Sequence, residues 1–231
     1  MPPTPPVGEL RLVDDVPTAF AEVVVAEFTA ARSAAAGGSG DGRFRMALSG
    51  GETARACYQQ LAAEAGIDWA AVDVLLGDER CVPPDDPAAN QRLVREALLA
   101  PTGDLARFRP MDCENPGAYE ALLLSEPPLD LIHLGLGPDG HTASLFSGSA
   151  ALTAPEDSLV VLSEDPSGLN PHPRLTFTFS AIARGRLVVF TVAGSGKHAA
   201  LRRLLDGEDL PAARVRAGRV LWLCDQAALQ G

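Results

Sequence analysis

Residues 129–148, LDLIHLGLGPDGHTASLFSG, constrain the fold of this chain more than any other segment. The apolar run 129–134 predicts a buried strand. It ends in a turn that contains Gly135, Gly137 and Gly140, and His141 follows directly. Such a turn brings backbone N–H groups and one imidazole to the carboxyl edge of a sheet, where ligands bind in open α/β folds. His141 is therefore a candidate general base.

The glycines of this turn match the G-x-G-x-x-G pattern of dinucleotide-binding folds, but the residues that follow argue against that function. The fingerprint requires a βαβ unit and an acidic residue about 20 positions further on. Gly148 and Pro155 leave room for a helix of only about two turns. Glu156 and Asp157 precede the next apolar run, and Pro138 lacks a backbone N–H. We expect no nicotinamide cofactor.

Apolar runs typical of strands alternate with helical segments along the chain. We expect strands at 44–48, 72–76, 129–134, 159–162, 175–179, 187–192 and 220–223, and helices at 16–36, 53–65, 88–99, 116–124 and 198–205. This alternation predicts an α/β fold of three layers, a Rossmann-like, mostly parallel sheet flanked by helices. The sequence has no clear linker, so we expect a single domain over residues 1–231 whose first eight residues are flexible.

Four of the expected strands are followed by glycine-bearing turns with polar or charged residues. These turns are SGGET (49–53), GDER (77–80), GLGPDGH (135–141) and AGSGK (193–197). Because parallel strands place their carboxyl ends along one edge of a sheet, the four turns are expected to meet there. The sequence therefore predicts one site built from segments that are far apart in the chain.

Two of these turns indicate a phosphate-binding region. Ser49, Gly50, Gly51 and Thr53 precede or begin a predicted helix, whose free N–H groups bind anions. Lys197 is the chain's one lysine among arginines, and it offers a point charge for the same phosphate. A cap with a glycine turn is the alternative interpretation of the first segment.

The turn around Lys197 is not a P-loop. In the required spacing the first glycine falls on Thr191, and His198 occupies the position of the Ser or Thr. An NTPase is therefore not expected. No group of histidines and carboxylates has metal-ligand spacing either, so we expect no metal.

The ionic residues after the strand at 72–76 are further candidates. Arg80 would stabilise an oxyanion or bind substrate oxygens, and Asp78 would orient the ligand or the catalytic histidine. Arg174 could clamp a phosphate through two N–H groups. The alternatives are a solvated ion-pair cluster and a surface arginine. His133, which lies inside an apolar run, is interpreted as a packed histidine and not as a catalyst.

Composition limits the partners and the compartment. The formal net charge of −11 argues against nucleic acid binding, which needs concentrated positive charge. No apolar run reaches the 18 residues of a membrane span, and the proline-rich start lacks the apolar core of a signal peptide. We therefore expect a cytoplasmic protein that binds no membrane. Its four scattered cysteines are expected to be reduced and partly buried, with no disulfide and no metal.

The motifs together resemble those of the 6-phosphogluconolactonases. The matching blocks cover about residues 47–228: LSGGETARACYQQL, LLGDERCVPPDDPAANQRLVREALL, the segment 129–148, PRLTFTFSAIARGRLVVFTVAGSGKHAALRRLLDG, and LPAARV followed by VLWLCDQAA. GPDGHTASLF is the most specific block, because the related deaminases carry a sequence like DGHIAFNEPG at this turn. The resemblance implies the fold group of glucosamine-6-phosphate deaminase and ribose-5-phosphate isomerase.

The resemblance also implies an activity, the hydrolysis of 6-phospho-D-glucono-1,5-lactone to 6-phosphogluconate without a cofactor. His141 would activate water, and Arg80 with backbone N–H groups would stabilise the oxyanion. The groups implied to hold the 6-phosphate are Ser49, Gly50, Gly51, Thr53, Arg174 and Lys197. The partner is then a small sugar phosphate, and the protein is expected to be a monomer or a weak homo-oligomer.

Three departures from the family pattern stand in the resembling blocks, and the first is Phe146-Ser147-Gly148 where the family often has Phe-Pro-Gly. The chain has Ala89-Asn90 where the family often has Ser-Asn, and Glu52-Thr53-Ala54 where it usually has Ser-Thr-Pro. Glu52 is expected to face solvent, because an inward carboxylate would repel a phosphate. The alternative functions are a sugar-phosphate isomerase or deaminase of the same fold group, and a non-catalytic sugar-phosphate sensor.

Overall fold

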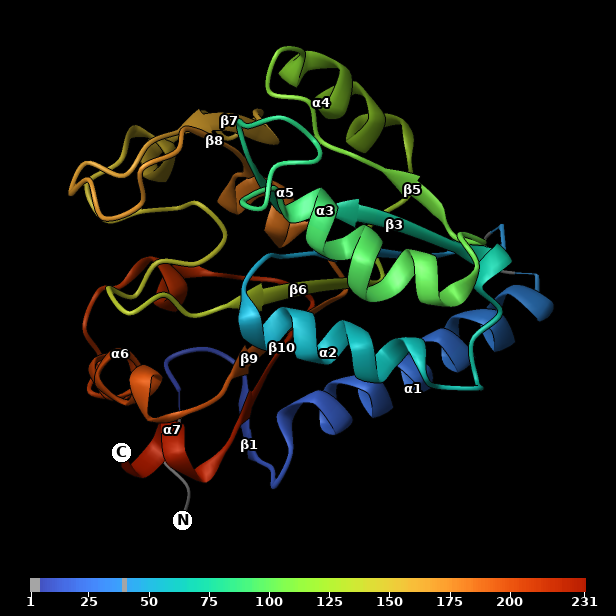
Figure 1. The fold of residues 1–231 in the computed structure, drawn as a ribbon, viewed down its shortest axis with the longest axis horizontal. Coiled ribbons are helices and arrows are strands. Elements are labelled where there is room, and N and C mark those ends of the chain that lie inside the picture. The colour runs from blue at the N-terminus through green and yellow to red at the C-terminus, as the bar shows by residue number, and fades with distance from the viewer. Residues whose placement is uncertain (1–4, 39–40) are drawn as a thin grey trace.

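A computed structural model describes residues 5–38 and 41–231 of the chain (Figure 1). Its centre is a seven-stranded sheet of order β1-β10-β9-β6-β2-β3-β5, in which every neighbouring pair is parallel. The strands are Glu9–Leu12 (β1), Phe44–Leu48 (β2), Val72–Leu76 (β3), Arg107–Arg109 (β5), Leu131–Gly135 (β6), Leu187–Val192 (β9) and Arg219–Cys224 (β10). The predicted parallel sheet is thus confirmed.

Helices flank this sheet, as the alternating pattern predicts. They are Val16–Ala36 (α1), Glu52–Ala62 (α2), Asn90–Val94 (α3), Pro116–Ser125 (α4), Phe179–Ala183 (α5), His198–Leu205 (α6) and Gln226–Gln230 (α7). A π-helical segment, Arg95–Leu99, continues α3. Helices α1, α2 and α3 lie side by side along the sheet in Figure 1. Strands β2, β3 and β9 are buried along their whole length, as expected for a parallel sheet covered on both faces.

A second, antiparallel sheet was not predicted. It has the order β4-β8-β7 and consists of Asp78–Arg80 (β4), Arg174–Phe177 (β8) and Val160–Ser163 (β7). The ionic residues expected in a turn therefore form a strand, because β8 supplies backbone partners 94 to 98 residues away along the chain. Phe179 begins α5 and does not end a strand, since the Thr178 hydroxyl caps that helix at Ala181 N.

The short helix expected after His141 does not form. Residues 141–149 make turns and a bridge between Thr142 and Leu145, and a 3₁₀ turn follows at Ala150–Thr153. Ala143 has a φ of 47°, a left-handed conformation that an α-helix cannot contain. The segment therefore folds over the sheet edge as an extended loop.

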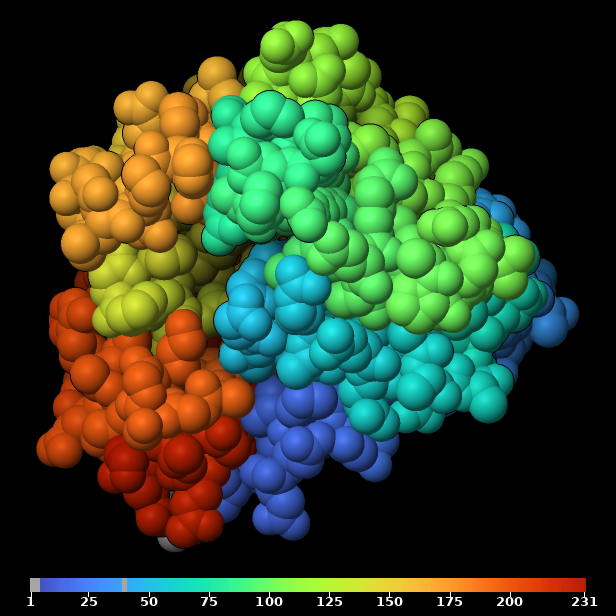
Figure 2. Space-filling model, viewed as in Figure 1, coloured from blue at the N-terminus to red at the C-terminus, as the bar shows by residue number. Residues whose placement is uncertain are grey.

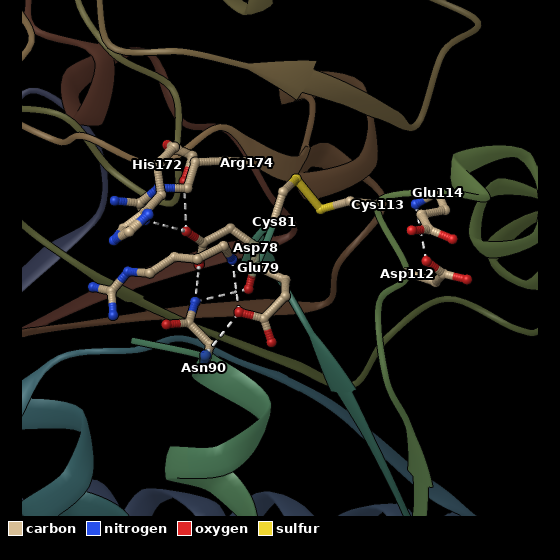
Figure 3. The surroundings of a disulfide bond; sticks show 11 residues. Asp78, Glu79, Cys81, Asn90, Asp112, Cys113, Glu114, His172 and Arg174 are labelled. Atoms are coloured by element: carbon tan, nitrogen blue, oxygen red, sulfur yellow. Dashed lines mark hydrogen bonds and ion pairs between the residues drawn. A yellow bond between two sulfur atoms is a disulfide. The ribbon is translucent and has the colours of Figure 1, made fainter. Parts of the chain in front are cut away.

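Two cysteines expected to be reduced are joined in a disulfide, Cys81–Cys113, with Cα atoms 5.5 Å apart (Figure 3). The expectation was wrong because spacing along the chain did not show that the end of β4 meets the turn between β5 and α4. Cys57 and Cys224 are free and buried. Burial raises the pKa of each of these thiols to about 12.

The start of the described chain is held to the sheet by a hydrogen bond. Of the eight residues expected to be flexible, 1–4 lie outside the described residues, and the Val7 carbonyl accepts a hydrogen bond from Trp222 Nε1 at 2.9 Å. Within residues 5–38 and 41–231, no helix combines the length and apolarity that crossing a bilayer would take.

Candidate active site

A cleft of about 190 Å³ opens at the carboxyl ends of β9, β6, β2 and β3, which are consecutive in the sheet. The surface is hollowed there, where segments distant in sequence meet (Figure 2). The four glycine turns line this cleft together, as the strand pattern predicts. So do the residues proposed from the sequence: His141, Arg80, Asp78, Ser49, Gly50, Gly51, Thr53, Arg174 and Lys197.

His141 is oriented by a carboxylate that the sequence interpretation missed. Its Nδ1 lies 2.5 Å from Asp139 Oδ1, and its backbone N–H donates to the same oxygen at 3.3 Å. The hydrogen bond from His141 lowers the pKa of the Asp139 carboxyl. Because an ionised Asp139 can only accept a hydrogen bond, the neutral imidazole carries its proton on Nδ1. The free lone pair of the ring is then on Nε2. Within the described chain, Nε2 has no hydrogen-bond partner.

The glycine turn is shaped to hold this pair. A Cβ atom on Gly137 would lie 2.2 Å from His141 Nδ1 and 2.7 Å from Asp139 Oδ1. The turn is closed by hydrogen bonds from Gly137 N to His141 O and from Gly140 N to Gly137 O. Gly137 is therefore required by the Asp139–His141 pair and not by a pyrophosphate.

Asp78 does not orient His141, contrary to one expected role. Its Oδ2 accepts a hydrogen bond from Ser144 Oγ at 2.6 Å. Its Oδ1 accepts one from Asn90 Nδ2 at 3.2 Å, and Figure 3 shows Asp78 and Asn90 side by side. Asp78 is only 4% exposed. It connects β4 to the loop after His141 and to the start of α3, so it shapes the cleft wall.

Arg174 is a buried residue of the cleft and not a surface arginine. Its Nη1 lies 3.9 Å from Asp78 Oδ2, and its Nε donates to the His172 carbonyl at 3.1 Å. Burial lowers the pKa of Arg174, although a guanidinium remains charged in proteins. The Phe146 ring lies between it and His141, 5.8 Å from the Arg174 guanidinium carbon and 4.8 Å from the imidazole centre.

Arg80 stands opposite Arg174 in the β4–β8 register. Its Nη1 donates to the Ala88 carbonyl at 2.5 Å. Because a guanidinium carries five N–H donors, this bond leaves others for a ligand. The side chain is partly exposed at the cleft. The two arginines therefore give the cleft local positive charge within an acidic protein.

The start of α2 supplies free backbone donors. The N–H groups of Glu52, Thr53 and Ala54 have no acceptor in the described part of the chain, and no side chain caps the helix. Such a helix terminus attracts anions. Glu52 is exposed, as expected, but it still borders the cleft.

Ser49 and Lys197 complete this region in different ways. The Ser49 hydroxyl donates to the His133 carbonyl at 2.7 Å, so its proton is not free for a phosphate. Lys197 Nζ donates to the Leu136 carbonyl at 2.8 Å and has further donors for a ligand. Burial lowers the pKa of Lys197, while the negative charge of Asp139 opposes this shift.

His133 is a packed histidine. Its Nδ1 pairs with the Tyr58 hydroxyl at 2.9 Å and its Nε2 with Thr191 Oγ1 at 2.8 Å. Burial lowers the pKa of His133 to about 3, which keeps it neutral. It lies under the cleft with both nitrogens occupied.

Two further asparagines belong to the cleft, and sequence reasoning gave neither a role. Asn90 donates to the Asp78 carbonyl at 2.9 Å as well as to its carboxylate. Asn170 is held by Asp165 Oδ2 through both its backbone and side-chain nitrogens.

Of the groups that sequence reasoning missed, Asp139 had a signal in the sequence, since it stands two residues before His141. Among residues 5–38 and 41–231, no group of three or more His, Cys, Asp or Glu side chains is arranged to hold a metal.

Comparisons with known proteins agree with this geometry. Residues 15–222 match the family model described as glucosamine-6-phosphate isomerases/6-phosphogluconolactonase. A 6-phosphogluconolactonase from a Synechocystis species is 39% identical over 208 residues, covering 81% of this chain and 84% of that protein.

Solved structures give the same result. A 6-phosphogluconolactonase from Shewanella baltica aligns with a TM-score of 0.78 at 30% identity, over 94% of this chain and 97% of that one. A monomeric glucosamine-6-phosphate deaminase has a TM-score of 0.79 at 17% identity, over 95% and 98% of the two chains, which indicates a shared fold alone. The chain belongs to the glucosamine-6-phosphate isomerase/6-phosphogluconolactonase family.

Proposed function

We propose that this protein hydrolyses 6-phospho-D-glucono-1,5-lactone to 6-phospho-D-gluconate, the second step of the oxidative pentose phosphate pathway. The observation that carries the proposal is the Asp139–His141 pair at a cleft that also holds anion-binding groups. Relatives at 36–39% identity that carry the name 6-phosphogluconolactonase support the substrate.

Water is the nucleophile in this mechanism. His141 Nε2 removes a proton from water as its oxygen attacks C1 of the lactone, and a tetrahedral oxyanion forms. The oxyanion collapses, the bond between C1 and the ring oxygen breaks, and the imidazolium returns the proton to the leaving oxygen. A lactone is an activated ester, so no covalent intermediate is needed. Positioned acid–base catalysis contributes about 10²–10⁴-fold.

The charged groups have separate tasks. Asp139 stabilises the imidazolium, and Arg80 with nearby backbone N–H groups stabilises the oxyanion. Arg174, Lys197 and the N–H groups at the start of α2 bind the 6-phosphate. Gly50 and Gly51 let the backbone approach it, and the Thr53 hydroxyl adds a donor.

The proposal extends to the cofactor requirement, the compartment and the partners. Water is the sole co-reactant, so the reaction itself requires neither a cofactor nor a metal. We propose one catalytic domain in the cytoplasm, acting on a small sugar phosphate as a monomer or a weak homo-oligomer, with no nucleic acid partner.

A glucosamine-6-phosphate deaminase or isomerase activity is the second candidate, because the matching family model covers both kinds of enzyme. A lactonase activity is favoured by the segment Thr142-Ala143-Ser144-Leu145-Phe146 after His141, which matches the lactonase form of this turn and not the deaminase form. Ammonia release from glucosamine-6-phosphate would establish this alternative. Tight sugar-phosphate binding without turnover would instead establish a sensor.

The test is acid release from freshly generated lactone by the purified wild type, by His141→Ala and by an enzyme-free control, since the lactone also opens spontaneously. We expect rapid wild-type turnover that falls about 10²–10⁴-fold in the variant. No acceleration by the wild type would refute the activity. Near-normal turnover in a folded His141→Ala protein would refute the role of His141.

A further inference from the structure

The Glu79 carboxylate is buried in β4 directly below the cleft wall. It is 1% exposed, and its chain neighbours Asp78 and Arg80 both line the cleft, whereas Glu79 does not. No Lys, Arg or His side chain within the described residues forms an ion pair with it. A buried carboxylate without a cation is costly unless hydrogen bonds compensate. Burial raises the pKa of Glu79 despite the backbone N–H groups that oppose this shift.

Three backbone N–H groups converge on this carboxylate. Oε1 accepts from Arg80 N at 2.6 Å and from Asn90 N at 2.7 Å, and Oε2 accepts from Gln91 N at 2.7 Å. Asn90 and Gln91 are the first residues of α3, where N–H groups lack partners within the helix. The preceding residue, Ala89, provides no side-chain cap. Glu79 therefore caps α3 from a neighbouring strand.

This arrangement links two cleft residues that belong to different elements. Arg80 lies in β4 and Asn90 in α3, yet a single carboxylate oxygen of Glu79 holds both backbones. Figure 3 shows Glu79 beside Asn90. The Asn90 side chain then reaches Asp78 and packs on Gly50, where a Cβ atom would lie only 2.0 Å from Asn90 Oδ1. A shift of the Glu79 carboxylate would thus move Arg80 and Asn90 relative to the turn at Gly50.

We propose that Glu79 is a positioning residue, which sets the placement of Arg80 and Asn90 in the cleft without touching the substrate. The kinetic test of this role rests on the proposed function, because KM and kcat are measured with the lactone as substrate. It predicts that weakening the Glu79 contacts lowers kcat, because Arg80 stabilises the oxyanion, and raises KM, because Asn90 shapes the cleft at Gly50.

The test compares Glu79→Gln with the matched control Asp130→Asn. One terminal atom of Gln is an amide nitrogen, which cannot accept an N–H, so at least one of the three bonds is lost. Asp130 is also a buried carboxylate that accepts a backbone N–H, from Arg45, but it lies at the amino end of β6. Both variants are expected to lose stability. Only Glu79→Gln is expected to change the kinetics, with a KM about tenfold higher and a kcat at least about tenfold lower than in the wild type.

Calorimetry with 6-phosphogluconate compares the two variants without turnover. The affinity for this product is expected to weaken about tenfold in Glu79→Gln and to stay unchanged in Asp130→Asn. A folded Glu79→Gln protein with KM and affinity within twofold of the wild type would overturn the proposal. An equal effect of Asp130→Asn would do so too. A wild type that binds the product but leaves the lactone intact would refute the proposed function, while the calorimetric ratio would still decide on Glu79.

Amide hydrogen exchange of the wild type covers the case in which Glu79→Gln does not fold. Product binding is expected to slow exchange at Arg80, Asn90 and Gln91 by similar factors, because their N–H groups share one acceptor. Protection of Arg80 with an unchanged Gln91 amide would contradict the proposal.

Discussion

At the scale of single residues, the Asp139 carboxylate controls which nitrogen of His141 can act as a base. Because Nδ1 donates to Asp139, the lone pair of the neutral ring lies on Nε2. We predict that Asp139→Asn lowers kcat by about 10²–10⁴-fold, with a smaller change in KM. Steady-state kinetics on the lactone measure both constants. The same change at Asp165, which holds Asn170 at the rim, should affect kcat far less.

A second residue-scale prediction concerns Gly137. The Cβ atom of Gly137→Ala would overlap the contact between His141 and Asp139. We expect kcat to fall at least about tenfold, because a misplaced base loses much of its contribution. Circular dichroism and thermal unfolding would check that the fold is retained. Gly117→Ala is the control, because a Cβ there meets nothing within 4 Å. Equal kinetics in both variants would contradict the role given to Gly137.

Glu52 makes a third residue-scale prediction. This exposed carboxylate borders the anion-binding end of α2. We expect Glu52→Gln to lower KM by about two- to fivefold, an effect that salt should weaken because screening already reduces the repulsion. The same change should cost about 0.3–1 kcal/mol of stability, since an acidic residue suits a helix N-terminus. Glu64→Gln, beyond the other end of α2, is the kinetic control.

At the scale of elements, the disulfide Cys81–Cys113 ties β4 to the turn before α4. Its cysteines are 32 residues apart in sequence, a loop for which the chain-entropy model gives roughly 3–4 kcal/mol of stabilisation. We predict that dithiothreitol lowers the free energy of unfolding of the wild type by this order in urea titrations. The double variant Cys81→Ser, Cys113→Ser should show no response. An unchanged wild-type midpoint under reducing conditions would refute the prediction.

Elements with strong local patterns match the sequence-based expectation. The bounds of α1, β2, β3, β9 and α6 coincide with those predicted. Each of these elements has an apolar face, or is apolar throughout, and buries these apolar residues in the core. The strands β1, β4 and β5 were missed, because each has only three or four residues and depends on a partner strand.

At the scale of the whole molecule, the buried neutral His133 links stability to pH. Its pKa is about 3 in the folded protein against an ordinary value of 6.5. Below pH 6.5 the unfolded chain binds a proton that the folded protein excludes, so stability falls as pH falls from 6.5 towards 3. The slope approaches about 1.4 kcal/mol per pH unit.

The variant His133→Asn should show this contribution. It is expected to be less stable at pH 7, because it loses the contacts to Tyr58 and Thr191. Between pH 6.5 and 5 its stability should decline by up to about 2 kcal/mol less than that of the wild type. Urea unfolding at both pH values measures this difference, and His172→Asn serves as a control at a partly exposed site. Parallel pH profiles would count against the prediction.

The sequence by itself determined the parallel sheet, the edge where the four turns meet and the placement of His141 at that edge. These features follow from local apolar runs and from the geometry of parallel strands, so no knowledge of distant contacts is required. Only the tertiary structure decided the partners of Asp78, the donor state of the Ser49 hydroxyl, the disulfide and the cap that Glu79 provides. Each of these depends on which distant segments meet at short range, and hydrogen bonds and disulfides are sensitive to separations that sequence spacing does not encode.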